Sequence, residues 1–230
     1  MRNPSVRDPL ATGTSERQRE GAMNEHPPLA YRAALRALIS CIASTVQLLR
    51  WRRIHLPAGH VGMRLRFADG TSARVYRETV VDRGATQDPC VLVVEFRLRA
   101  VRGRAHAAFR WESLLNTPLF VGFPGFVSKL WLANDERGRY RGLYEWDGPR
   151  RAEDYARALW RVLALVSVPN SIHYIVLPGL RRDELLGQPQ IMASTAMADP
   201  AAWWRPAEFA QATPKREDLT RFPSSVASGS

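Results

Sequence analysis

Two histidines are the side chains best suited to acid–base chemistry in the patterned middle of this 230-residue chain. His106 and His173 are the histidines that fall between positions 90 and 178, and an imidazole titrates near neutral pH. Either could take a proton from a phenolic substrate, so both are candidate catalytic residues. A surface or hydrogen-bonded structural histidine is the common alternative. Glu95 and Glu145 are further acid–base candidates, although strand carboxylates among many arginines more often form ion pairs.

Aromatic side chains are frequent in the same stretch. An apolar cleft with a few polar groups is the usual shape of a small-molecule site, so we expect some of these rings to line a cavity. Each ring could instead belong to the core, because large aromatics dominate ordinary cores. Asn116 could donate a hydrogen bond to a substrate or cap a helix end. The candidate substrate-binding residues are Phe109, Trp111, Asn116, Trp131, Tyr144, Trp146 and Tyr155.

Several common site motifs are absent from the sequence. There is no GxGxxG after a strand, no GxxxxGK[ST] phosphate loop and no GxSxG elbow, so a nicotinamide, flavin, nucleotide or serine-hydrolase site is not predicted. The five histidines do not show metal-site spacing, and no metal site is predicted. We therefore expect no cofactor. Haem stays open as an alternative, because one suitably placed histidine, His106 or His173, would suffice.

The elements that must position these residues follow from hydrophobic periodicity and turn residues. A helix begins after the Asp-Gly-Pro at 147–149, where Asp147 can cap its N-terminus. One face of the strand at 90–99 is apolar and the other is mixed, which predicts a core on one side. The predicted elements are strands at 90–99, 126–133, 139–146 and 172–177, with helices at 104–116 and from 149 to about 168. Their order, βαββαβ, predicts an α+β, ferredoxin-like fold with an antiparallel sheet.

The flanking segments differ in character from this unit. Alternation over 63–67 and 72–81 around an Ala-Asp-Gly turn predicts a β-hairpin, and a helix is predicted over 29–51. The two ends of the chain are polar or rich in Pro, Ala, Ser and Thr. The predicted division is a disordered N-terminus (1–28), a helix and hairpin extension (29–89), the ferredoxin-like domain (90–186) and a flexible C-terminal tail (187–230). Within the tail, the pair Trp203-Trp204 could alternatively dock on the domain or on a partner.

The helix predicted over 29–51 has a broad apolar stripe. Its longest uncharged run, 37–49, is shorter than the ~20 apolar residues needed to span a bilayer. Arginines lie on both sides of that run, which would suit a helix lying on an anionic membrane. The commoner alternative is packing against the domain or a partner subunit. Peripheral membrane contact through residues 29–53 is thus one open prediction.

Two motifs carry a resemblance to a known family. PGF at 124–126 precedes a strand containing Trp131, and GLYEW at 142–146 leads into a helix containing Tyr155. Over residues 90–178 the chain resembles the YdhR-like monooxygenases of the dimeric α+β barrel superfamily. The resemblance implies a homodimer whose sheets face each other and a pocket between sheet and helices. It also implies cofactor-independent oxidation of aromatic substrates or haem chemistry, but it fixes no catalytic residue.

Charge and cysteine content narrow the setting. The net charge of +11 comes almost wholly from arginines that are spread along the chain, so no nucleic-acid partner is predicted. Cys41 and Cys90 are far apart with no secretory signal before them, which predicts a reduced cytoplasmic location, with the membrane surface as the alternative. Two functions follow as hypotheses. One is a monooxygenase-like oxidoreductase that binds an aromatic or apolar small molecule, and the other is a non-catalytic dimeric ligand-binding or membrane-peripheral module.

Overall fold

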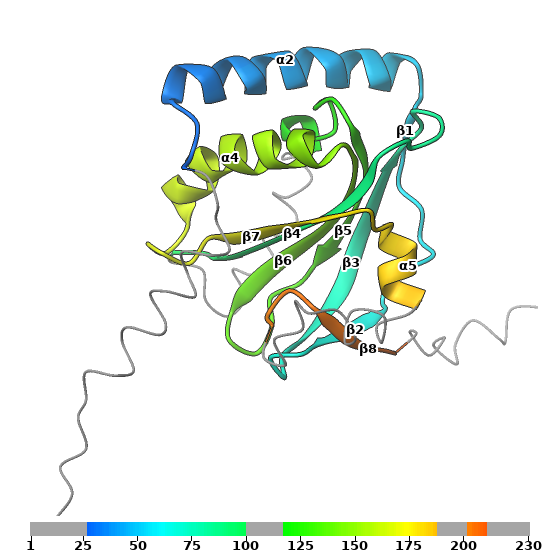
Figure 1. Ribbon diagram of the computed structural model, residues 1–230, viewed down its shortest axis with the longest axis vertical. Helices are drawn as coiled ribbons and strands as arrows, with labels where there is room; N and C mark the ends of the chain where they lie inside the picture. Colours follow the sequence, from blue (N-terminus) through cyan, green and yellow to red (C-terminus); the bar gives the residue numbers. More distant parts are fainter. Residues whose placement is uncertain (1–26, 100–116, 188–201, 211–230) are drawn as a thin grey trace, which may run out of the picture.

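The computed structural model describes residues 27–99, 117–187 and 202–210 of the chain (Figure 1). The helix predicted over 104–116 and the N-terminal segment 1–26 lie outside these residues. The elements are α2 (Tyr31–Arg50), β1 (Ile54–His55), β2 (Arg64–Phe67), β3 (Ser72–Val81), β4 (Pro89–Arg97), η1 (Thr117–Leu119), β5 (Phe126–Leu132), β6 (Arg139–Asp147), α4 (Pro149–Val166), β7 (His173–Pro178), α5 (Arg182–Gly187) and β8 (Pro206–Ala210).

The strands form one eight-stranded sheet in the order β7-β4-β6-β5-β3-β2-β8, with β1 paired to β3. Every described pair is antiparallel, and this curled sheet with helices is an α+β fold. The strands β4 to β7 occupy the relative order of a split βαβ unit. The helix that would complete this unit falls outside the described residues, so the full βαββαβ unit stays a prediction. The hairpin β2–β3 extends the same sheet and is not a separate layer.

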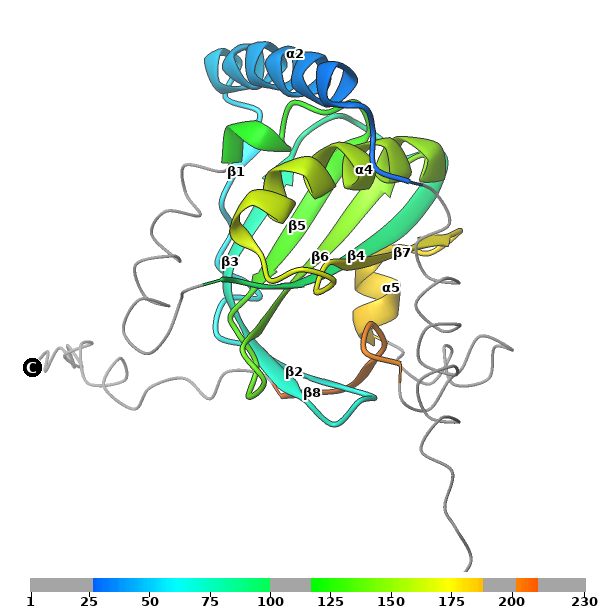
Figure 2. The same ribbon diagram turned by 90° about the vertical axis from the view of Figure 1, so that its left-hand side faces the viewer.

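Both faces of the sheet are buried, which corrects the prediction of a core on one side. Along β4, Cys90, Leu92 and Val94 pack beneath α2 and α4, whereas Val91 and Val93 belong to a second cluster on the opposite face. Figures 1 and 2 show α2 and α4 on one side of the sheet and α5 and β8 on the other. The second face is covered by the chain's own C-terminal segments, and the middle of β4 is therefore buried on both faces.

The covering segment includes part of the predicted flexible tail. Within 187–230, residues 202–210 do not fit that prediction, because Trp203 and Trp204 are buried and β8 pairs with β2. The sequence signal was the adjacent tryptophan pair, whose large apolar area is buried against Leu185 and its neighbours on the sheet. The physical reason is the apolar sheet face, which needs a cover.

The helix α4 begins at a glycine rather than at the predicted cap. Gly148 is the N-cap with φ 105°, a conformation that glycine adopts at little cost, and Pro149 follows in the first turn. The Asp147 carboxylate instead accepts the backbone N–H groups of Gln87 and Asp88 at 2.9 and 2.8 Å. Asp147 therefore fixes the loop before β4 against the start of α4.

Candidate functional site

Four predicted site residues meet in one aromatic cluster between the sheet and α4. Trp131, Tyr144, Trp146 and Tyr155 are all buried in the cluster beneath the helices. The ring centroids of Trp146 and Tyr155 are 4.8 Å apart, and the Tyr155 hydroxyl donates to the Tyr144 hydroxyl at 3.3 Å. Burial raises the pKa of both tyrosines, that of Tyr155 well above its ordinary value. These rings pack on one another as core, and both phenols are neutral.

The residue that sequence reasoning missed in this cluster is Lys129. It lies two residues before Trp131 on β5, and the period of a strand places both side chains on the same face. The ammonium nitrogen is 3.2 Å from the Trp131 ring centroid, 4.6 Å from that of Tyr144 and 4.7 Å from that of Phe120. No carboxylate among the described residues forms an ion pair with it. The sequence did carry a signal for this residue, because one of the chain's two lysines falls at a strand position whose neighbours on the same face are apolar.

Burial dominates the charge state of this lysine. It holds the pKa of Lys129 well below its ordinary value, and the positive charge of Arg77 acts in the same direction. The Arg77 guanidinium also lies over the Trp131 ring, 3.8 Å from its centroid. The cluster therefore combines an aromatic wall with an amine that loses its proton more readily than a surface lysine. Such an amine can act as a base.

A glycine on the neighbouring strand makes room for one of these rings. Gly142 is paired with Trp131 across β5 and β6, and a Cβ there would lie 2.6 Å from the ring of Tyr144. The Trp131 indole N–H donates to the Thr79 hydroxyl at 3.1 Å, which fixes the second ring. The sequence motif GLYEW at 142–146 thus has a packing role, because its glycine admits the ring of its tyrosine.

The other predicted site residues do not join the cluster. His173 pairs with Glu95 at the start of β7 and lies on the opposite sheet face, with its ring 6.2 Å from that of Trp203. The described residues therefore do not fit a haem held by His173 within the aromatic cluster. The remaining candidates, His106, Phe109, Trp111 and Asn116, lie outside the described residues.

The two candidate strand glutamates form ion pairs. Glu95 forms ion pairs with Arg141 at 2.7 Å and with Arg139 at 3.1 Å, in a buried cluster that also contains Asp69 and Asp135. Glu145 lies 3.6 Å from Arg181. Burial raises the pKa of both glutamates, while the neighbouring arginines oppose that shift. Among the described parts of the chain, no three His, Cys, Asp or Glu side chains are grouped to hold a metal ion.

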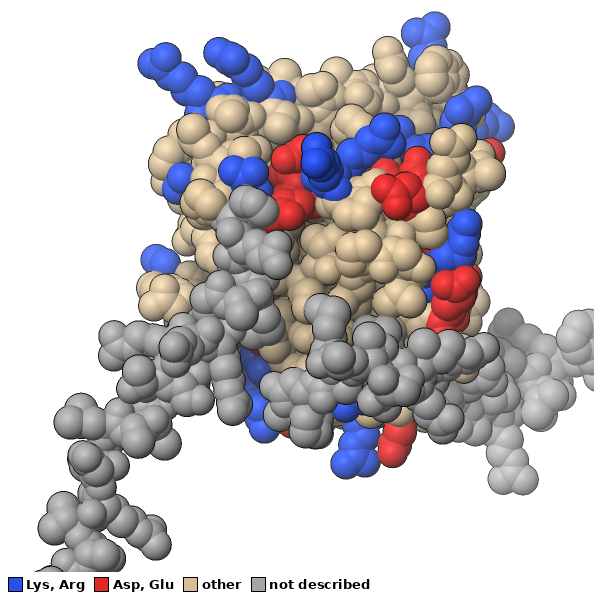
Figure 3. Space-filling model, viewed as in Figure 1, with Lys and Arg blue, Asp and Glu red and all other residues tan. Residues whose placement is uncertain are grey.

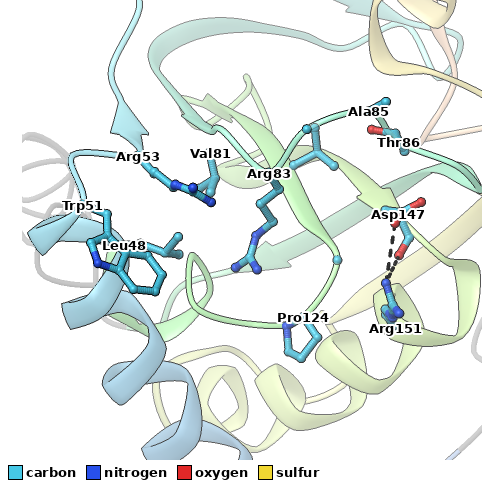
Figure 4. A pocket seen from close by; sticks show the side chains of 13 residues that line it. Leu48, Trp51, Arg53, Val81, Arg83, Ala85, Thr86, Pro124, Asp147 and Arg151 are labelled. Atoms are coloured by element: carbon cyan, nitrogen blue, oxygen red, sulfur yellow. Dashed lines mark hydrogen bonds and ion pairs between the residues drawn. The ribbon is translucent and has the colours of Figure 1, made fainter.

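A separate pocket of about 390 Å³ lies between the C-terminal end of α2, the loop after β3 and the start of α4 (Figure 4). Arg53, Arg83 and Arg151 converge on it from three different segments, and Asp147 is the one acidic residue in its lining. Its wall is half apolar. The lining residues are Leu48, Trp51, Arg53, Val81, Arg83, Gly84, Ala85, Thr86, Pro124, Gly125, Val127, Asp147 and Arg151.

The three arginines are held differently. The Nη2 of Arg83 donates to the carbonyls of Val121 and Phe123 at 2.9 and 3.2 Å, and Figure 4 shows its guanidinium directed into the pocket. Burial lowers the pKa of Arg83 from its ordinary value, with a smaller contribution in that direction from Arg151. Arg151 lies 3.5 Å from the Asp147 carboxylate. Arg53 lies beside Trp51. With three cations and one carboxylate, the pocket suits an anion.

The outer face of α2 carries most of the exposed large hydrophobic side chains among the described residues. Its buried side consists of Ala34, Cys41, Thr45 and Leu48. Figure 3 shows uncharged surface along this helix with basic side chains at both ends. α2 is the one described helix long and apolar enough to cross a membrane, by length and composition. The exposed stripe consists of Leu35, Ile39, Ile42, Val46 and Leu49, each 42% to 59% exposed, between Tyr31 and Trp51 at the helix ends.

Comparison with known proteins adds little. No family model matches the chain, and no curated protein matches it. One solved structure is similar, an uncharacterized ferredoxin fold protein related to antibiotic biosynthesis monooxygenases from Listeria monocytogenes 4b F2365. The two share 13% identity with a TM-score of 0.35, over 60% of this chain and 88% of that protein. A likeness this slight assigns no reaction.

Proposed function

We propose that this chain is a peripheral membrane protein whose helix α2 lies in the interface of an anionic membrane. The observation that carries the proposal is the exposed apolar stripe of α2, Leu35 to Leu49. Five side chains about half exposed would gain roughly 5 kcal/mol on full burial in an apolar medium. An ordinary surface helix directs its apolar stripe into its own domain, whereas α2 packs on the domain through another side, which includes Cys41 and Leu48, and leaves this stripe exposed.

Charge complementarity supports an anionic membrane as the occupant of this face. Arg32 and Arg36 lie in the first two turns of α2, and Arg50, Arg52 and Arg53 lie at its end, all of them exposed. Basic residues near an anionic leaflet contribute about 1 kcal/mol each. The exposed rings of Tyr31 and Trp51 at the two helix ends are typical of a membrane–water interface.

The packing of α2 favours a helix that lies on the membrane over one that spans it. The Cys41 thiol donates to the carbonyl of Pro118 at 3.1 Å, and the Thr45 hydroxyl donates to the same carbonyl at 3.3 Å. The helix backbone at Cys41 also lies against Gly122 so closely that a Cβ there would collide with it. A spanning helix would have to give up these contacts with the domain, whereas an interfacial helix keeps them.

Flotation with lipid vesicles tests the proposal. We expect the full chain to float with vesicles of phosphatidylcholine and phosphatidylglycerol, and the double variant Ile39→Glu/Val46→Glu to stay in solution. The matched control is Ser40→Glu/Gln47→Glu, which adds the same charges at exposed positions of the same helix outside the stripe. A wild-type chain that does not float refutes the proposal. Equal losses in both variants would refute the role of the stripe and leave only electrostatic attraction.

A second copy of the chain is the main competing occupant. Sedimentation velocity that finds a dimer abolished by Ile39→Glu/Val46→Glu, without flotation, would assign α2 to a homodimer interface. The homodimer implied by the family resemblance is different, because there the sheets face each other. In this chain the corresponding sheet face is covered by α5, β8, Trp203 and Trp204. A dimer of that kind would require the C-terminal cover to move.

A second candidate function is the binding, and the monooxygenase-like oxidation, of an aromatic or apolar small molecule next to Lys129. The observation that favours it is the buried amine among the rings of Phe120, Trp131 and Tyr144. A neutral Lys129 amine could take a proton from a phenol. Native mass spectrometry and an absorption spectrum of the purified chain would reveal a bound aromatic molecule or haem. Loss of that ligand in Lys129→Met, without loss of thermal stability, supports this function, whereas an empty wild-type protein contradicts it.

A further inference from the structure

We propose that the arginine-lined pocket beside α2 binds the phosphate of an anionic phospholipid headgroup. This inference rests on the proposed membrane contact and extends it from a general attraction to a defined binding site. The pocket begins where the membrane-facing helix ends, because Leu48 and Trp51 both line it and Trp51 is exposed at the end of the apolar stripe. A headgroup in the pocket would therefore lie next to the proposed interface.

The arginines offer donors on three sides of the pocket. Arg83 uses Nη2 to hold the carbonyls of Val121 and Phe123, and its Nε and Nη1 have no hydrogen-bond partner among the described residues and can face a ligand. Guanidinium groups bind phosphate oxygens through paired N–H donors, and they do so best where burial limits hydration. Arg83 is the inner group, whereas Arg151 is 56% exposed and can close on a ligand from the rim. Arg53 stands on the α2 side.

The apolar half of the wall favours a lipid over a free anion. Leu48, Val81 and Pro124 offer contacts that inorganic phosphate cannot use, whereas the glycerol and acyl carbonyl region of a phospholipid can. Asp147 partly neutralises Arg151, so the three arginines and one carboxylate give the pocket a net charge of about +2. This charge suffices for one phosphate group but not for a polyanion. The position and the lining together specify a single lipid phosphate.

Titration with a short-chain lipid tests the site without a membrane. Dihexanoyl-phosphatidylglycerol below its micelle concentration is titrated into the full chain by calorimetry, with inorganic phosphate in a parallel arm. We expect Arg53→Gln/Arg151→Gln to weaken lipid binding at least about tenfold. The control is Arg74→Gln/Arg97→Gln, two exposed strand arginines outside the pocket, which should bind like the wild-type chain.

The titration and the flotation assay separate the pocket from the helix α2. Equal weakening in the pocket variant and the control refutes the pocket as the site. Inorganic phosphate that binds as tightly as the lipid refutes the lipid and identifies a free anion as the ligand. Failure of the wild-type chain to bind the soluble lipid refutes this inference even when vesicle flotation succeeds. Failure of flotation with intact binding of the soluble lipid refutes only the interfacial role of α2.

Discussion

The contact between α2 and the loop after η1 can be broken by one methyl group. In Gly122→Ala, the new Cβ would collide with the carbonyl oxygen of Cys41 and lie 2.7 Å from the Thr45 hydroxyl. Ordinary van der Waals contact needs about 3.5 Å, so α2 would have to move away by roughly 1 Å or more. Overpacking of this kind costs about 1–3 kcal/mol. Because α2 packs at the outside of the domain, we expect that cost to appear as local opening of the helix.

Thiol labelling measures this opening. Cys41 is buried on the inner side of α2 and Cys90 is buried in strand β4, so the wild-type chain should react slowly with Ellman's reagent at both positions. A local cost of 1–3 kcal/mol raises the open population about 5- to 150-fold, and labelling of Cys41 should accelerate by that factor. Labelling of Cys90 should stay slow, because its strand does not open with α2.

The matched control is Gly59→Ala, where a Cβ meets no atom within 4 Å. It adds the same methyl group without a collision and should label like the wild-type chain. Unchanged labelling of Cys41 in Gly122→Ala would refute the close packing of α2 on the domain. Equal acceleration at Cys41 and Cys90 would show that the variant unfolds as a whole, which would refute α2 as a separately opening element.

Two further predictions concern buried charges. The folded pKa of Lys129 lies below the ordinary 10.5, so between those two values the unfolded chain binds more protons than the folded chain. The free energy of unfolding of the wild-type chain should therefore rise with pH by up to about 1.4 kcal/mol per pH unit. Urea unfolding of Lys129→Met should lack that rise, and the same pH dependence in both proteins would contradict the lowered pKa. Arg141→Gln should cost about 3–5 kcal/mol, because the fully buried guanidinium holds Asp69 at 3.1 Å and Glu95 at 2.7 Å. Its control Arg66→Gln breaks only the exposed pair with Glu208 and should change the unfolding free energy by less than about 1 kcal/mol. Equal changes in the two variants would show that the buried ion pairs of Arg141 contribute no more than an exposed pair.

The strands were predictable because their side chains alternate. β5 and β6 begin where the sequence pattern placed them, at positions 126 and 139, and α2 ends one residue before the predicted helix does. Period-2 and period-3.6 patterns are local, so a single sequence carries them. The position of Lys129 was also within reach, because the same alternation puts it beside Trp131 on the core face.

The ion cluster and the C-terminal cover were not predictable in this way. Arg141 meets Asp69 across 72 positions of sequence, and no local pattern pairs residues so far apart. The side of the sheet on which His173 lies depends on the register of β7 against β4, which the strand pattern alone leaves open. Asp147 looked like a helix cap from its neighbours, but two loop N–H groups compete for the same carboxylate.

The α2 contact and the arginine pocket share one loop, and this links the two proposed sites. Gly122 lies against Cys41 and Thr45 of α2, while the residues on either side of it, Val121 and Phe123, give their carbonyls to Arg83. A ligand that draws Arg83 further into the pocket would therefore pull on the loop that supports α2. Conversely, an interfacial helix that shifts on the membrane would move the carbonyls that orient Arg83. The two sites are thus expected to favour each other's occupancy only while this loop keeps its contact with α2. Gly122→Ala should therefore weaken both the binding of the soluble lipid and flotation with vesicles.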